Sequence, residues 1–183
     1  MILEKGLLIG MTNVPNDRAS NPAHQAGVEL TTQAKVYAAR MRLQDSLDQA
    51  DALEAIREIV ANLMGSEELA IYKVDQEKAA LWLYWSFGID PNKYAVLDVI
   101  REPHLESVLE RRIVIRGDHG NEKLLSTGDT VTALVPIFVS GETAAVLVIF
   151  RLLPQKPAFE AADRQICEVL SHCAGRAIEP YRT

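Results

Sequence analysis

The chain has 183 residues, of which 48% are hydrophobic and 24% charged, as in a soluble protein with one main domain. Its net charge of −6, with no dense block of Lys and Arg, argues against a nucleic-acid surface. No apolar run approaches the ~20 residues that span a bilayer. We therefore expect a cytoplasmic protein with neither a nucleic-acid nor a membrane partner.

The first 28 residues have little hydrophobic periodicity. Polar and turn-forming residues crowd its middle: Asn13, Pro15, Asn16, Asp17, Ser20, Asn21 and Pro22. Such a composition buries little apolar surface. We predict a flexible N-terminal tail over residues 1–28 that contributes little to stability, unless Leu7-Leu8-Ile9 docks on the body. Residues 180–183 are predicted to form a short C-terminal tail.

From Glu29 the pattern becomes helical. Leu30, Tyr37 and Met41 recur at coiled-coil spacing with Ala34, and a second apolar stripe adjoins them through Val36, Leu43 and Leu47. One stripe can lie on the helix's own domain, which leaves the other uncovered. We predict a dimerisation helix over residues 29–47, with homodimer contacts through Leu30, Tyr37, Met41 and the final helix.

A second helix and a hairpin follow. Ser46 or Asp48 is a suitable N-cap, and Gly65 a suitable end, for a helix whose apolar face carries Leu53, Ile56, Val60 and Leu63. Strands over 69–74 and 79–87 are joined by a polar turn. Strict alternation along the second strand places Trp85 and Phe87 on one face with Leu83, and Trp82 and Tyr84 on the other.

The remaining elements complete a sheet protein. The chain continues with a short helix over 104–111, a brief central strand over 113–115 and a polar loop or short helix over 117–129. A second hairpin follows. Its strands, 131–139 and 144–150, flank a turn at Ser140-Gly141-Glu142, and their continuous apolarity is typical of strands covered on both faces. An amphipathic helix begins near Phe159. Strands with helices segregated around them predict an α+β domain.

In this order the segments resemble the GAF domain, a small-molecule-sensing module related to PAS domains. The matching residues are Leu53-x-x-Ile56-x-x-Ile59-Val60, Ala70-Ile71-Tyr72-x-Val74-Asp75, Val108-Leu109-Glu110, Val114-Ile115-Arg116-Gly117-Asp118, Ala133-Leu134-Val135-Pro136-Ile137 and Phe159-x-x-x-Asp163 leading to Ala177-Ile178-Glu179. The resemblance implies a GAF-like domain over 48–179. Its central antiparallel sheet would have about six strands. Terminal helices would pack on one face, and crossover helices and loops would roof a pocket on the other.

The resemblance also places a candidate ligand site, between the sheet and the segment from Asp90 to Thr130. The candidate ligand-binding residues are Trp85, Tyr94, Arg116, Asp118 and Thr132. Arg116 and Asp118 follow a strand, where a cation and a carboxylate can orient a polar ligand over an aromatic floor. The rival interpretation is that both are solvated charges at a strand end. The ligand and any cofactor stay unidentified.

Three functions are compatible with these residues. The first is a non-catalytic, dimeric signalling module that binds a small molecule, a protein partner, or both. The second is a degenerate GAF scaffold without a ligand, which acts only through protein–protein interaction. The third is a small enzyme of the free methionine sulfoxide reductase type. That family needs cysteines near the pocket, whereas Cys167 and Cys173 lie on the last helix, so we expect no enzyme. The four histidines lack metal-ligand spacing, and we expect no metal.

Overall fold

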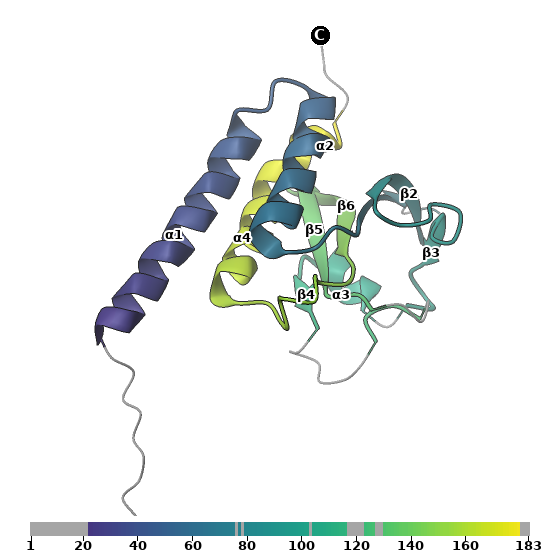
Figure 1. Ribbon diagram of the computed structural model, residues 1–183. Coiled ribbons are helices and arrows are strands. Elements are labelled where there is room, and N and C mark those ends of the chain that lie inside the picture. Colours follow the sequence, from purple (N-terminus) through teal and green to yellow (C-terminus); the bar gives the residue numbers. More distant parts are fainter. Residues whose placement is uncertain are drawn as a thin grey trace, which may run out of the picture.

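The framework of the protein is a six-stranded antiparallel sheet with the strand order β3-β2-β1-β6-β5-β4. Its strands are β1 (Leu69–Asp75), β2 (Ala80–Phe87), β3 (Val96–Asp98), β4 (Val114–Ile115), β5 (Ala133–Val139) and β6 (Glu142–Ile149). Figure 1 shows the computed structural model, which describes residues 22–75, 77, 79–102, 104–116, 123–126 and 130–179. The predicted α+β fold with a central antiparallel sheet of about six strands is confirmed.

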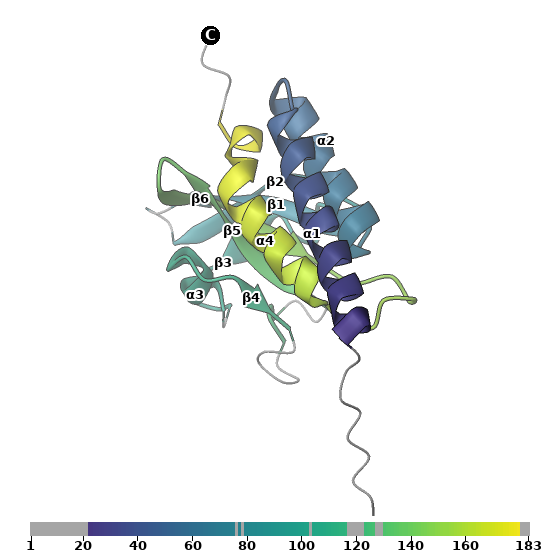
Figure 2. The same cartoon turned by 90° about the vertical axis from the view of Figure 1, so that its left-hand side faces the viewer.

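Helices cover one face of this sheet. They are α1 (Pro22–Gln44), α2 (Gln49–Glu58) with its π-helical continuation η1 (Ile59–Met64), and α4 (Ala161–Cys173) with the 3-10 turn η2 (Ala174–Ala177). Figure 2 shows α1 lying along α4, with α2 beside them. Their shared core with the sheet is aliphatic and fully buried, as at Ile56, Val135, Leu147, Ile166 and Leu170. Helix α4 packs on β5 and along α1, so it connects α1 to the sheet.

Local sequence explains where α2 and η1 begin and end. The Asp48 carboxylate accepts a 2.8 Å hydrogen bond from the backbone N–H of Asp51, which caps the first turn of α2. At the other end, Gly65 adopts a left-handed φ of 73° as the C-cap of η1. The predicted helix from Ser46 or Asp48 to Gly65 therefore has the expected ends, with a π-helical last part.

The start of α4 is also determined by local sequence. Glu160 is its N-cap, and a capping box joins the side chains of Glu160 and Asp163 to each other's backbone N–H groups. The helix ends at Cys173, and Gly175 follows in η2. A Cβ at Gly175 would lie 2.9 Å from the carbonyl oxygen of Phe138, so a glycine here allows η2 to approach β5 closely.

The opposite face of the sheet is covered by α3 (Leu105–Leu109) and by the loops around it. Figure 2 shows α3 on the far side of the sheet from α1 and α4. The side chains in this layer include Tyr72, Leu81, Leu105, Leu124, Leu125 and Phe150, each at most 1% exposed. The layer is where the ligand site was predicted to lie.

Several boundaries differ from the sequence prediction. Helix α1 begins at Pro22 instead of Glu29, because a proline is well suited to the first turn of a helix. The short strand predicted at 113–115 is β4, which lies at an edge of the sheet and not at its centre. Strand β3 was not predicted, since three residues carry too little pattern. The predicted flexible tail over 1–28 is wrong for residues 22–28, which are helical. Residues 1–21, including Leu7-Leu8-Ile9, and the predicted C-terminal tail over 180–183 lie outside the described residues.

Candidate functional site

The face of the sheet that lies beneath α3 carries buried polar groups. Glu102 is 7% exposed, and its carboxylate accepts hydrogen bonds from Ser126, at 2.5 Å from the backbone N–H and 2.7 Å from the hydroxyl. The Tyr72 hydroxyl is buried and has no hydrogen-bond partner among the described residues. Burial raises the pKa of Tyr72, and the nearby Tyr94 and Glu102 raise it further. The Tyr72 phenol therefore stays protonated and presents an O–H group inside the layer.

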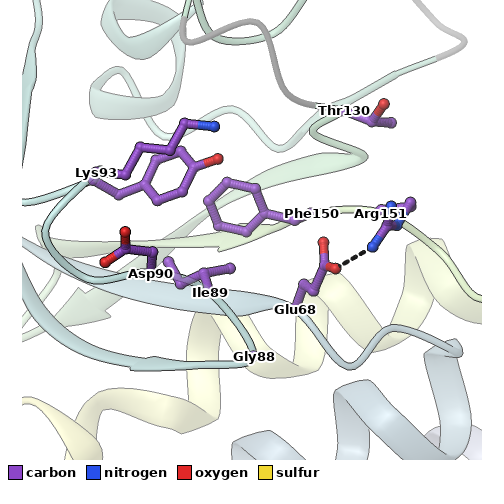
Figure 3. A pocket seen from close by; sticks show the side chains of 9 residues that line it. Glu68, Gly88, Ile89, Asp90, Lys93, Thr130, Phe150 and Arg151 are labelled. Atoms are coloured by element: carbon purple, nitrogen blue, oxygen red, sulfur yellow. Dashed lines mark hydrogen bonds and ion pairs between the residues drawn. The ribbon is translucent and has the colours of Figure 1, made fainter.

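One edge of this layer opens to solvent in what we term the rim cleft, shown in Figure 3. Its volume is about 350 Å³, and it is lined by Glu68, Gly88, Ile89, Asp90, Lys93, Tyr94, Thr130, Phe150 and Arg151. The rings of Tyr94 and Phe150 meet edge to face, with centroids 5.0 Å apart. Across the cleft, a guanidinium nitrogen of Arg151 lies 2.5 Å from the Glu68 carboxylate. The rim cleft thus combines an aromatic wall with charges of both signs.

The strand pairing brings these residues together. The backbone N–H of Phe150, just after β6, donates a 2.9 Å hydrogen bond to the carbonyl of Glu68, just before β1. This bond extends the β1–β6 ladder and places Glu68 and Arg151 at one end of the sheet. Gly88 then turns the chain out of β2 with a φ of 73°. As a result Asp90 and Lys93 reach the same opening.

A second opening, which we term the connector cleft, adjoins the first through Thr130 and Arg151. It has a volume of about 440 Å³ and is lined by Ile115, Arg116, Thr130, Thr132, Arg151, Leu152, Leu153, Pro154, Lys156, Pro157, Ala158 and Phe159. One wall is the end of β4 and the other is the connector, residues 150–160, between β6 and α4. The Arg116 backbone N–H donates to the Thr132 carbonyl at 2.8 Å, and the Thr132 hydroxyl donates to the Phe150 carbonyl at 2.6 Å.

The predicted ligand-binding residues separate in the structure. Tyr94 lines the rim cleft, while Arg116 and Thr132 line the adjoining connector cleft. Asp118 lies outside the described residues. Trp85 packs on the opposite, helix-covered face of the sheet and lines neither cleft.

The prediction that Trp85 and Leu83 share a face is wrong, and a β-bulge is the reason. Ile71 pairs with Trp85 and the next residue, Tyr72, pairs with Leu83, which leaves Tyr84 as an extra residue in β2. Tyr84 and Trp85 therefore both pack against the helix-side core, while Leu83 packs on the other side.

Sequence reasoning missed the residues that contribute most of the charge in the rim cleft. These are Glu68, Asp90, Lys93 and Arg151. Glu68 directly precedes β1, and Arg151 lies just after β6. Asp90 and Lys93 lie in the break after β2. A search for charged residues next to strand ends would have found all four. Their proximity depends on the pairing of β1 with β6, which no local pattern reveals.

Neither cysteine lines the rim cleft or the connector cleft. Cys167 and Cys173 are on α4, and both pack into the core on the helix-covered face. Burial raises the pKa of the Cys167 thiol to about 12, with a further contribution from Asp163. Within the described ranges, no group of three His, Cys, Asp or Glu side chains could hold a metal ion. Nor does any helix there combine the length and the apolar character that a membrane span requires.

The outer face of α1 carries an uncovered apolar stripe. Leu30 is 68% exposed and Tyr37 is 66% exposed, and Met41 is half-buried. On the inner face of the same helix, Ala39 and Leu43 are buried against the rest of the domain. The three predicted dimerisation residues therefore lie along the outer side of α1.

A six-stranded antiparallel sheet, with helices on one face and a roofed layer on the other, is the fold of GAF domains. No family model matches the chain, and no curated protein matches it. Several solved structures, however, are similar to it. The chain is similar to a GAF domain/HD domain protein from Geobacter sulfurreducens, with a TM-score of 0.56 and 20% identity over 74% of this chain and 95% of the other. It is also similar to the GAF domain of a phosphoenolpyruvate-protein phosphotransferase from Coxiella burnetii, with a TM-score of 0.61 and 15% identity over 80% and 92%.

An enzyme also shares the fold. Free methionine-R-sulfoxide reductase from Neisseria meningitidis, solved with its substrate, has a TM-score of 0.56 and 15% identity over 80% of this chain and 89% of the other. At these identities the likeness establishes the GAF fold, and function must be argued from the site.

Proposed function

We propose that this protein is a non-catalytic signalling module with the GAF fold. It forms a homodimer through α1 and α4, binds a small molecule in the rim cleft and passes the bound state to a protein partner. The observation that carries this proposal is that the two sides of α1 have different surroundings. One side of the helix belongs to the core of its own domain, and the other presents an apolar stripe to solvent.

The two sides of α1 each follow coiled-coil spacing. The outer side carries Leu30, Ala34, Tyr37 and Met41, and the inner side carries Val36, Ala39 and Leu43. Both sets alternate steps of three and four residues, which is the heptad spacing of a helix packed along another helix. The inner set is covered by α4 and α2. A second copy of the same helix is the natural cover for the outer set.

Charges beside the outer stripe support a parallel arrangement. With Leu30 and Tyr37 at d positions, Arg40 is at a g position, and Asp45, in the turn directly after α1, continues the register at the following e position. In a parallel pair the g residue of one helix faces this e residue of the other. Arg40 and Asp45 are both exposed, so a parallel dimer gains two attractive charge pairs that an antiparallel dimer lacks.

The dimer is tested by light scattering of the purified protein at micromolar concentration. The wild type should have the mass of a dimer, and Tyr37→Glu should have that of a monomer that still unfolds in one cooperative thermal transition. Val28→Glu is the matched control, because Val28 is also exposed on α1 but lies off the stripe. A wild-type monomer, or a dimer that survives Tyr37→Glu, would overturn this part of the proposal.

The rim cleft supports the binding of a small polar molecule. Its volume of about 350 Å³ falls within the range of small-molecule sites. Lys93 and Asp90 provide one charge of each sign beside the rings of Tyr94 and Phe150. This combination suits a zwitterion or another small molecule with both a donor and an acceptor.

Ligand binding is tested with a thermal-shift screen of metabolites, followed by titration of any molecule that stabilises the protein. Lys93→Met and Asp90→Asn should each weaken binding about tenfold, as expected for the loss of one hydrogen bond to a charged group. Both residues are exposed, so the midpoint of the free protein should stay within a few degrees. If no metabolite stabilises the protein, the degenerate scaffold becomes the better description.

The reductase alternative is disfavoured by the position of the cysteines. Thiol chemistry on a bound sulfoxide requires a thiolate at the ligand. Cys167 and Cys173, the two cysteines of the chain, both pack on the face of the sheet away from α3. A sulfoxide reductase activity that disappears in Cys173→Ser would contradict the non-catalytic proposal.

A further inference from the structure

The connector cleft has a distinct charge. Three cations line it, namely Arg116, Arg151 and Lys156, and none of its lining residues that the structure describes is acidic. The rim cleft beside it has two acidic and two basic residues instead. In a protein with a net charge of −6, three cations around one cleft are unexpected and attract an anion.

The three cations differ in how far their charge is already neutralised. Lys156 is paired with the buried carboxylate of Asp163 at 2.7 Å, and Arg151 with Glu68 at 2.5 Å. Arg116 is exposed and forms no ion pair within the described part of the chain. Its guanidinium is the cation most able to bind an incoming acid, because a carboxylate fits two of its N–H groups at once.

The other wall of the cleft is apolar. The connector contributes Leu152, Leu153, Pro154, Pro157, Ala158 and Phe159, and Ile115 of β4 faces them. This wall is held in place before any ligand arrives. The Leu153 backbone N–H donates to the Gly65 carbonyl at 2.8 Å, and the Lys156 N–H to the Leu153 carbonyl at 2.9 Å. A preformed wall loses little conformational freedom on binding.

We propose that the connector cleft binds an apolar carboxylate, with the acid on Arg116 and the hydrocarbon body along Leu152–Phe159. The hydroxyl of Thr130 lies in the same lining and can donate to the acid. A volume of about 440 Å³ accommodates a chain of medium length. This site adjoins the rim cleft, with which it shares Thr130 and Arg151, but the inference depends neither on the dimer nor on a rim-cleft ligand.

The site is positioned to affect the helices. Its apolar wall leads directly into α4 through Phe159 and the capping residue Glu160, and α4 packs along α1. A ligand bound against the connector therefore contacts the segment that leads into α4, the helix along which α1 packs.

The experiment titrates octanoate into the full-length protein by calorimetry, with octan-1-ol and octylammonium as probes of the same length. Octanoate should bind in a saturable manner at least tenfold more tightly than either of the other two. Arg116→Gln should weaken octanoate about tenfold, the loss of one charged hydrogen-bonding partner. Arg101→Gln removes the same charge at an exposed position outside the cleft and should leave the affinity unchanged.

A second variant tests the site independently of Arg116. Ala158 is exposed and lines the cleft, so Ala158→Asp places a carboxylate beside the apolar wall without disturbing the core. It should abolish octanoate binding while preserving the thermal midpoint. Equal binding of the three probes, or unchanged octanoate affinity in both Arg116→Gln and Ala158→Asp, would overturn the proposal.

Discussion

The Lys156 ammonium group lies 2.7 Å from the carboxylate of Asp163, whose side chain is fully buried. The second Asp163 oxygen accepts a 2.7 Å hydrogen bond from the backbone N–H of Glu160, the N-cap of α4. One carboxylate thus joins the connector to the first turn of α4. Because the same connector forms a wall of the connector cleft, this ion pair joins that wall to the start of α4.

Replacing Lys156 by Met should destabilise the protein by about 3 kcal/mol, because it leaves the buried Asp163 carboxylate without its cation. The measurement is the free energy of unfolding in urea. Lys35→Met is the control, since Lys35 and Glu160 form a longer, 3.8 Å pair at the surface. That exposed pair should contribute less than about 1 kcal/mol. Equal effects of the two substitutions would show that Asp163 does not depend on Lys156.

Replacing Tyr72 by Phe should stabilise the free protein by about 1 kcal/mol, since the hydroxyl is buried without a partner among the described residues. The ring would keep its place in the core between the sheet and α3. Destabilisation by Tyr72→Phe would mean that a bound water or ligand satisfies the hydroxyl in solution.

Replacing Gly88 by Ala should destabilise the protein more than the same change at Gly141. Both glycines have left-handed φ values, 73° and 84°. A Cβ at Gly88 would lie 1.9 Å from the carbonyl oxygen of Glu67, whereas at Gly141 it would meet nothing within 4 Å. Gly141→Ala should cost about 1 kcal/mol from backbone strain alone.

Gly88→Ala must in addition shift the backbone at Glu67, next to the rim cleft. Urea unfolding should therefore show a difference between the two variants of at least 1–2 kcal/mol, roughly the size of a core packing defect. Indistinguishable variants would mean that the turn after β2 relaxes freely.

The two cysteines should differ in their reaction with iodoacetamide at pH 8. Burial raises the pKa of Cys167 to about 12, so only about one thiol in ten thousand is ionised at that pH. Cys173 is only half-buried. Mass spectrometry of the native protein should show one alkylated cysteine per chain, at Cys173, and two after denaturation. Rapid modification of Cys167 in the native protein would show that α4 opens readily.

Much of the fold follows from local sequence, because the responsible interactions are local. The spacing of Leu53, Ile56, Val60 and Leu63 predicts a helix, and the cap at Asp48 and the glycine at 65 mark its ends. The turn at Gly141 and the apolar strands beside it predict the last hairpin. The outer and inner stripes of α1 are likewise readable from a period of three and four residues.

Which residues line the candidate site depends on the tertiary structure. The extra residue Tyr84 in β2 is defined only by pairing with β1, and it turns Trp85 to the helix-covered face. Glu68 and Arg151 meet because β1 pairs with β6 across a large sequence separation. The sequence by itself determined which segments are helices and strands, since caps and hydrophobic periods act over a few residues. Which side chains share a cleft depended on strand register and order, which exist only once distant segments pair.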